Sequence, residues 1–109
     1  MVIVDLPKAV RQYFDSRNAF DVAAALAQFE DDAFVEDENV EHRGRDSIRE
    51  WLEETEAKYH PRFETQAAKQ VGDHLVVTTV VSGTFPGSPL SIDHAFVLSG
   101  EKINRLVIG

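Results

Sequence analysis

The stretch Gln28-Phe29-Glu30-Asp31-Asp32-Ala33-Phe34-Val35-Glu36-Asp37 decides the fold, because it closes a helical segment and opens a strand. Side chains alternate along a strand, so Ala33, Val35 and Asp37 share one side. Asp37 is therefore the carboxylate most able to face the interior, although a solvated strand end explains the same pattern. An aspartate that ends an apolar row is a candidate catalytic base.

Composition limits the classes of function. The chain has 109 residues, a length that predicts one domain over residues 1–109. Its formal net charge of -8 argues against nucleic acid or an anionic membrane as a partner. There is no cysteine, and the four histidines show no paired spacing, so we expect no metal and no cofactor. No segment approaches the ~20 apolar residues of a membrane span, and we expect a cytoplasmic protein.

Two helices are predicted before the first strand. Asp5 is placed as a cap with Pro7 in the first turn, and apolar positions then recur at helical spacing: Leu6, Val10, Tyr13 and Phe14, with Arg17. Tyr13 lies on the buried face, where its hydroxyl needs a polar partner, either in a pocket or at a backbone carbonyl. Asp21 caps a second helix that carries Val22, Ala25, Leu26 and Phe29.

A third helix follows residues 38–45, which are too polar for the core and predict a loop. Ser47 and Glu50 have the spacing of a capping box. The inward stripe of this helix is Ile48, Trp51, Leu52, Thr55 and Tyr59. Its solvated face is Glu53, Glu54 and Glu56.

From Pro61 onward the chain reads as strands joined by turns, over residues 62–71, 74–85, 90–98 and 102–108. This pattern predicts an α+β fold: three N-terminal helices packed in the concave face of a curved, mainly antiparallel sheet, a cone-shaped α+β barrel.

The strand over residues 90–98 carries a second acid, Asp93. One face holds Ser91, Asp93, Ala95 and Val97, and the other holds Ile92, His94, Phe96 and Leu98. The second face is apolar enough to be buried, and a second copy of the chain is the simplest cover for it, which predicts a homodimer through the outer sheet face. His94 then packs at that interface. Asp93 would lie on the helix-facing side, where it must be paired or protonated.

The order of these motifs resembles the nuclear transport factor 2-like superfamily, which includes the SnoaL-like polyketide cyclases. The run from Phe29 to Asp37 leads into Arg43-Gly44 and Ile48-Arg49-Glu50. Within the superfamily the chain is most similar to bacterial ketosteroid isomerase, a steroid delta-isomerase. The motifs that carry this likeness are Arg11-Gln12-Tyr13, Val35-Glu36-Asp37, and Ile92-Asp93-His94 ahead of Gly100-Glu101-Lys102.

The resemblance implies an enzyme that moves a proton α to a carbonyl in a small hydrophobic ligand, without a cofactor. Asp37 would take the proton, while Tyr13 and a protonated Asp93 would donate hydrogen bonds to the oxyanion. Ketosteroid isomerase is itself a known case of an acid kept neutral by an apolar site, so the role of Asp93 rests on the resemblance alone. The residues expected to line the substrate pocket are Phe29, Val35, Trp51, Leu52 and Ala95.

Two alternatives stay open at this level. A SnoaL-like cyclase or dehydratase would use the same acid–base groups on another substrate. A non-catalytic small-molecule-binding domain would use them only to hold a ligand, because fold alone does not determine function.

Overall fold

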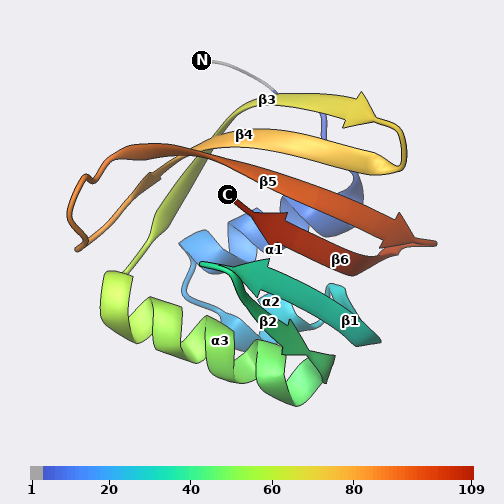
Figure 1. Cartoon of the computed structure of the whole chain (residues 1–109), viewed down its shortest axis with the longest axis horizontal. Coiled ribbons are helices and arrows are strands. Elements are labelled where there is room, and N and C mark those ends of the chain that lie inside the picture. The colour runs from blue at the N-terminus through green and yellow to red at the C-terminus, as the bar shows by residue number, and fades with distance from the viewer. Residues whose placement is uncertain (1–3) are drawn as a thin grey trace.

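The computed structural model describes residues 4–109, which form three helices and six strands. Figure 1 shows their arrangement. In chain order the elements are α1 (Lys8–Asn18), α2 (Val22–Leu26), β1 (Phe29–Asp37), β2 (Val40–Arg43), α3 (Gly44–Tyr59), β3 (Arg62–Val71), β4 (His74–Ser82), β5 (Leu90–Ser99) and β6 (Lys102–Ile108).

The strands form one sheet in the order β2-β1-β6-β5-β4-β3. Only β1 and β6 pair in parallel, and the other neighbours are antiparallel. The sheet curves around the helices but stays open, with β2 and β3 as its two edges (Figure 1). The predicted α+β fold with a curved, mainly antiparallel sheet is confirmed.

The core lies between the helices and the inner face of the sheet. Aromatic rings meet there edge to face, with Tyr13 5.2 Å from Phe14 and 5.7 Å from Phe29 between ring centroids. Such pairs add to the free energy gained by burying the rings. Other fully buried apolar side chains come from every layer: Val10, Ala33, Val35, Ile48, Leu52, Val77, Phe96, Ile103 and Leu106.

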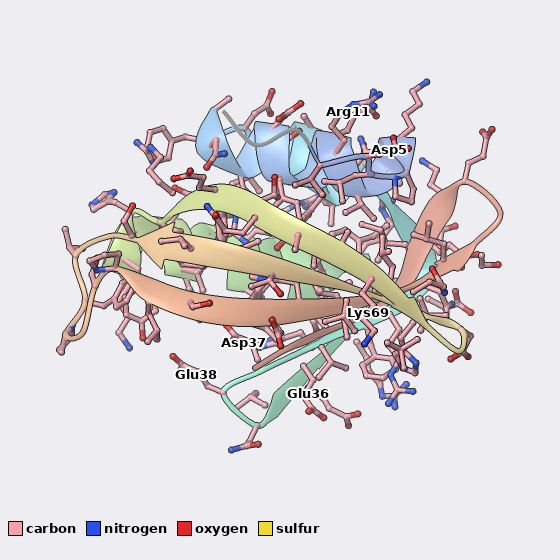
Figure 2. The ribbon with its side chains drawn as sticks, turned by 90° about the horizontal axis from the view of Figure 1, so that it is seen from above. Asp5, Arg11, Glu36, Asp37, Glu38 and Lys69 are labelled. Carbon is pink, nitrogen blue, oxygen red and sulfur yellow. The ribbon has the colours of Figure 1, made fainter. Side chains whose placement is uncertain are left out.

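Of the three side-chain caps predicted at helix N-termini, only the one at α2 is present. Asp21 caps α2 as expected, because its Oδ1 accepts a hydrogen bond from the Ala24 N–H at 3.0 Å. The predicted cap at Asp5 is wrong: Pro7 precedes the first helical residue, and Asp5 lies on the solvent side with Arg11 (Figure 2). The predicted capping box is also wrong, because α3 already begins at Gly44 with no side-chain cap.

The polar segment after Asp37 is a hairpin and not a loop. Glu38 and Asn39 have φ angles of 53° and 64°, and β2 then pairs antiparallel with β1. Two consecutive residues with positive φ are typical of the tight turns whose twist suits hairpin strands. Its charged residues suit an edge strand, which can present polar side chains to water. At the other end of β1, Phe29 belongs to the strand and not to α2.

The two faces of β5 are the reverse of the prediction. His94 and Phe96 face the helices and are buried, whereas Asp93 is exposed on the outer face. There Asp93 Oδ1 accepts a hydrogen bond from the hydroxyl of Thr78, its partner on β4, at 2.9 Å. The helices of the same chain therefore cover the apolar face for which a second copy was invoked. The homodimer stays a prediction, and it now concerns a face that carries Asp93 and Ala95.

The end of α1 is fastened to β3 by Asn18. Its side-chain N–H donates to the carbonyl oxygen of Phe63 at 2.8 Å, and its Oδ1 accepts from the Phe63 N–H at 2.7 Å. Because β3 is an edge strand, these bonds satisfy backbone groups that no further strand pairs. The neighbouring residue Arg17 is thereby held at a fixed place on the last turn of α1.

Asn18→Ala is expected to lower the free energy of unfolding by about 1–3 kcal/mol, because it leaves both Phe63 backbone groups without these partners. Urea denaturation followed by circular dichroism measures the change. Ser16→Ala on the same helix turn is the control and should stay within about 0.5 kcal/mol of the parent protein. Equal losses in the two variants would contradict the anchoring role.

Candidate functional site

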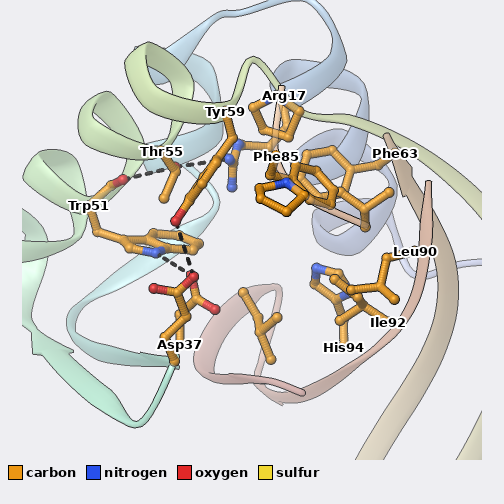
Figure 3. Close-up of a pocket in the computed structure, with 15 residues that line it drawn as sticks. Arg17, Asp37, Trp51, Thr55, Tyr59, Phe63, Phe85, Leu90, Ile92 and His94 are labelled. Atoms are coloured by element: carbon orange, nitrogen blue, oxygen red, sulfur yellow. Dashed lines mark hydrogen bonds between the residues drawn. The ribbon is translucent and has the colours of Figure 1, made fainter. Parts of the chain in front are cut away.

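A cavity of about 440 Å³ lies between α3, the end of β1 and the inner face of the sheet. Figure 3 shows it in close-up. Most of its lining side chains are apolar or aromatic: Trp51, Pro61, Phe63, Val81, Phe85, Pro86, Leu90, Ile92 and Ile108. Its polar side chains are Arg17, Asp37, Glu38, Thr55, Tyr59 and His94. An apolar cavity with a few convergent polar groups is the usual form of a small-molecule site.

Asp37 reaches this cavity from the end of β1, as its place in the alternating row predicted. The indole N–H of Trp51 donates to its Oδ2 at 3.0 Å (Figure 3). A hydrogen bond of this kind fixes the carboxylate while leaving its other oxygen available. Glu36 and Glu38 lie beside it at the same end of β1 (Figure 2). Glu38 accepts a hydrogen bond from the exposed Tyr59 hydroxyl at 3.3 Å.

Arg17 brings a positive charge into the cavity from the last turn of α1. Arg17 as a whole is only 3% exposed to solvent. Nη1 donates to the Tyr13 hydroxyl at 2.9 Å and Nη2 donates to Thr55 Oγ1 at 3.1 Å. The guanidinium carbon lies 5.2 Å from the ring centroid of Trp51 and 4.9 Å from that of Phe63, which is cation–π distance.

A carboxylate balances this buried charge. Glu56 Oε1 lies 3.5 Å from Arg17 Nε, and the side chain of Glu56 is only 12% exposed. The prediction that Glu56 belongs to the solvated face of its helix is therefore wrong. Burying a cation without such a partner would be strongly unfavourable.

Tyr13 lies behind Arg17 and does not line the cavity. Its ring is fully buried, and burial raises the pKa of its phenol despite the lowering effect of Arg17. The hydroxyl accepts from the guanidinium, so the polar partner that the sequence predicted is present, and it is Arg17 and not a backbone carbonyl. Tyr13 therefore acts on the cavity only through Arg17.

His94 enters the cavity wall from β5. Its Nδ1 lies 3.1 Å from Thr79 Oγ1, and Thr79 Oγ1 donates to the Ile92 carbonyl at 2.8 Å. Burial, assisted by the nearby charge of Arg17, lowers the pKa of His94 to about 4. The imidazole is therefore neutral at physiological pH. Figure 3 shows it across the cavity from Asp37.

The cavity contains fewer of the predicted site residues than expected. Asp37 and Trp51 line it, whereas Phe29, Val35 and Leu52 are buried in the core beside it. Asp93 and Ala95 lie on the outer face of the sheet, because the faces of β5 are reversed. The prediction that Asp93 and Ala95 share a pocket with Asp37 is therefore wrong.

Two cavity residues, Arg17 and His94, were missed as site residues. The signals were present: Arg17 lies four residues after Tyr13 on the same helix face, and His94 belongs to the apolar row of β5. A polar residue within an apolar row is a better indicator of a candidate site than a polar residue on a solvated face.

The loop between β4 and β5 closes one side of the cavity mouth. The N–H of Thr84 donates to the carbonyl oxygen of Tyr59 at 2.7 Å, and the Phe85 ring packs edge-on against Tyr59 at 5.8 Å. A Cβ on Gly83 would collide with the same Tyr59 carbonyl, so this position needs a residue without a side chain.

Among residues 4–109, no group of three or more His, Asp or Glu side chains is placed to hold a metal ion. Within the same residues no helix has the length and apolar character needed to cross a membrane.

A family model described as "SnoaL-like domain" matches residues 10–105, which is most of the chain. The chain belongs to the SnoaL-like domain family. This result confirms the resemblance to SnoaL-like proteins, and the fold is shared with a nuclear transport factor 2-like protein from Cytophaga hutchinsonii. Among functionally curated proteins, none matches this SnoaL-like domain at a significant level.

Solved structures share the architecture. A proposed polyketide cyclase from Sinorhizobium meliloti is 35% identical, with 96% of each chain covered and a TM-score of 0.92. A protein with a ketosteroid isomerase-like fold from Catenulispora acidiphila, solved with trimethylamine, is 20% identical, with 96% of this chain and 86% of that one covered and a TM-score of 0.83. The epoxide hydrolase/cyclase-like enzyme SalBIII, connected with pyran ring formation in salinomycin, is 22% identical, with 93% and 86% covered and a TM-score of 0.79. The last two likenesses establish the fold alone.

Acid should destabilise this SnoaL-like domain through His94. The unfolded histidine binds a proton near pH 6.5, whereas the folded one does so only near pH 4. Between these values the unfolded state binds more protons, so the free energy of unfolding should fall with decreasing pH by up to about 1.4 kcal/mol per pH unit. Urea titrations at several pH values measure this slope. His94→Gln should reduce it, whereas His60→Asn at an exposed site should not; an unchanged slope in His94→Gln would contradict the assignment.

Proposed function

We propose that this SnoaL-like domain is an enzyme that transfers a proton α to a carbonyl group in a small hydrophobic substrate. The observation that carries the proposal is the carboxylate of Asp37, held by the Trp51 indole at the wall of an apolar cavity that also contains a cation. A base and a group that stabilises negative charge are the two requirements of enolisation.

Asp37 serves as the base. As a carboxylate it is acceptor-only, and Trp51 holds one of its oxygens, so the other can receive a proton from a carbon acid in the cavity. Most of the surrounding side chains are apolar, which limits competition from water for the same oxygen.

Arg17 serves as the group that stabilises the oxyanion, in place of the predicted pair Tyr13 and Asp93. A guanidinium has five N–H donors. The bonds to Tyr13 and Thr55 use one hydrogen on each terminal nitrogen, and Nε faces Glu56. One N–H on each terminal nitrogen is left for a substrate oxygen. A preorganised cation in an apolar site stabilises developing negative charge strongly.

The reaction balances without a cofactor. The C–H bond α to the carbonyl breaks, its proton passes to Asp37, and the electron pair forms an enolate whose oxygen faces Arg17. Asp37 then returns the proton, to the γ-carbon in a steroid-type isomerisation or to the α-carbon in simple exchange.

The relative from Sinorhizobium meliloti favours a second reaction for the same residues, because it is a proposed polyketide cyclase at 35% identity. An enolate can attack a second carbonyl of the same molecule, forming a C–C bond and closing a ring. The proton that Asp37 removed then passes to the new alkoxide oxygen, so the two reactions differ in substrate and not in the role of the base.

Asp37→Asn is expected to lower the rate of α-proton exchange by about 10²–10⁴-fold, because the amide cannot take up the proton. Deuterium incorporation into 2-tetralone, followed by NMR in D₂O, measures the rate. A β,γ-unsaturated 3-ketosteroid, followed by conjugated-enone absorbance, tests the isomerisation directly.

Glu36→Gln is the matched control, because it removes a neighbouring carboxylate that lies on the other side of β1. Its rate should stay within a few-fold of the parent protein. Absence of activity on both compounds would overturn the proposed function, and loss of activity in Glu38→Gln but not in Asp37→Asn would move the base to Glu38.

The double variant Arg17→Gln with Glu56→Gln is expected to lower the maximal exchange rate by ~10²–10³-fold, since it removes the charge that faces the oxyanion. Changing both partners avoids leaving a buried carboxylate unpaired. Glu56→Gln alone keeps the cation, and although loss of the partner lowers stability, the fraction that is folded by circular dichroism should retain most of the rate. Similar losses in the single and double variants would argue that the ion pair matters only for structure.

A further inference from the structure

We infer that His94 determines substrate specificity by presenting an unprotonated Nε2 to the cavity, where it accepts a hydrogen bond from a hydroxyl group. If the proposed function holds, the substrate is then a small hydrophobic carbonyl compound that also carries a hydroxyl. The binding part of this inference does not depend on turnover.

A count of hydrogens fixes the tautomer. The Thr79 hydroxyl has one hydrogen, and the Ile92 carbonyl, which can only accept, takes it at 2.8 Å. The contact at 3.1 Å between Thr79 Oγ1 and His94 Nδ1 therefore needs a hydrogen from the imidazole. Nδ1 is protonated, and in a neutral ring Nε2 then carries a lone pair and no hydrogen.

The protein holds the ring in this orientation from several sides. Phe14 lies 5.3 Å from it and Phe63 lies 5.8 Å from it, both edge to face, and Phe96 stacks at 6.3 Å with an interplanar angle of 16°. Arg17 is the charged group on the helix side, and it disfavours a second positive charge on the ring. Asp93 on the same strand faces the opposite side of the sheet.

Nε2 has no hydrogen-bond partner within residues 4–109. Nε2 is not among the fully buried polar side-chain atoms of these residues that lack a partner, so it is open to the cavity that His94 lines. A ligand that brings a donor to Nε2 gains affinity over one that displaces water without replacing its hydrogen bond. The carboxylate of Asp37 offers no donor, and the hydrogens of Arg17 suit a carbonyl oxygen. The cavity thus has separate places for the hydroxyl, at His94, and for the reacting carbonyl, near Asp37 and Arg17 (Figure 3).

The tautomer can be measured directly in the unmodified protein. Long-range ¹H–¹⁵N spectra of ¹⁵N-labelled protein at neutral pH should show His94 with a protonated Nδ1 and an unprotonated Nε2. Thr79→Val removes the acceptor for Nδ1 at nearly equal volume, and we expect it to give a mixture of tautomers. A protonated Nε2 in the parent protein would overturn the inference.

The ligand preference is tested with 2-naphthol and 2-methoxynaphthalene, which differ in the hydrogen that can be donated. Isothermal titration calorimetry should give the parent protein about tenfold tighter binding of 2-naphthol. His94→Phe should reduce this preference to less than about twofold, and Thr79→Val should weaken it through the tautomer. No preference in the parent protein, or a preference that persists in His94→Phe, would overturn the inference.

Asp37→Asn separates this inference from the proposed function. It should retain the preference for 2-naphthol although it lacks exchange activity. A preference lost in Asp37→Asn and retained in His94→Phe would place the hydroxyl at Asp37. An inactive parent protein with the preference intact would remove the proposed reaction and leave the role of His94 standing.

Discussion

The buried guanidinium of Arg17 joins parts of the molecule that are distant in the sequence. Through hydrogen bonds, an ion pair and ring contacts it connects α1 with α3 and with β3. Burial of this charge is tolerable only because Glu56 and several polar oxygens surround it. The same side chain also lines the cavity. Arg17 therefore both links these elements of the fold and places a positive charge at the cavity.

The cavity combines the guanidinium of Arg17 and the carboxylate of Asp37 with the neutral imidazole of His94. His94 stays neutral because it is desolvated beside the cation of Arg17. Tyr13 remains protonated behind them. Such an arrangement offers a bound molecule different polar neighbours at different points of the cavity.

Local patterns in the sequence predicted much of this structure. Alternation placed Asp37 on the inward side of β1, and helical spacing placed Tyr13 in the core, because both depend only on periodicity along one element. The faces of β5 were assigned in reverse, since alternation separates two faces without saying which one the helices cover. That choice depends on how β5 pairs with β4 and β6, and β6 pairing includes a register shift between Val97 and Leu98.

The roles of Arg17 and His94 were harder to predict for a related reason. Each depends on partners from other elements: Thr55 and Glu56 on α3 for Arg17, and Thr79 on β4 for His94. Spacing within one helix or strand carries no information about such partners. In a single sequence, such partners are indicated only by a polar or charged residue inside an apolar row.

The loop between β4 and β5 is attached to the end of α3 through the backbone of Tyr59, whereas Asp37 and Arg17 come from β1 and α1. The entrance to the cavity and its charged side chains thus belong to different segments. Changes to the exposed part of this loop can alter which molecules enter without moving Asp37 or Arg17. Divergence of substrate range within one architecture then requires few replacements, provided that the residue at position 83 stays small enough for the loop to approach the helix.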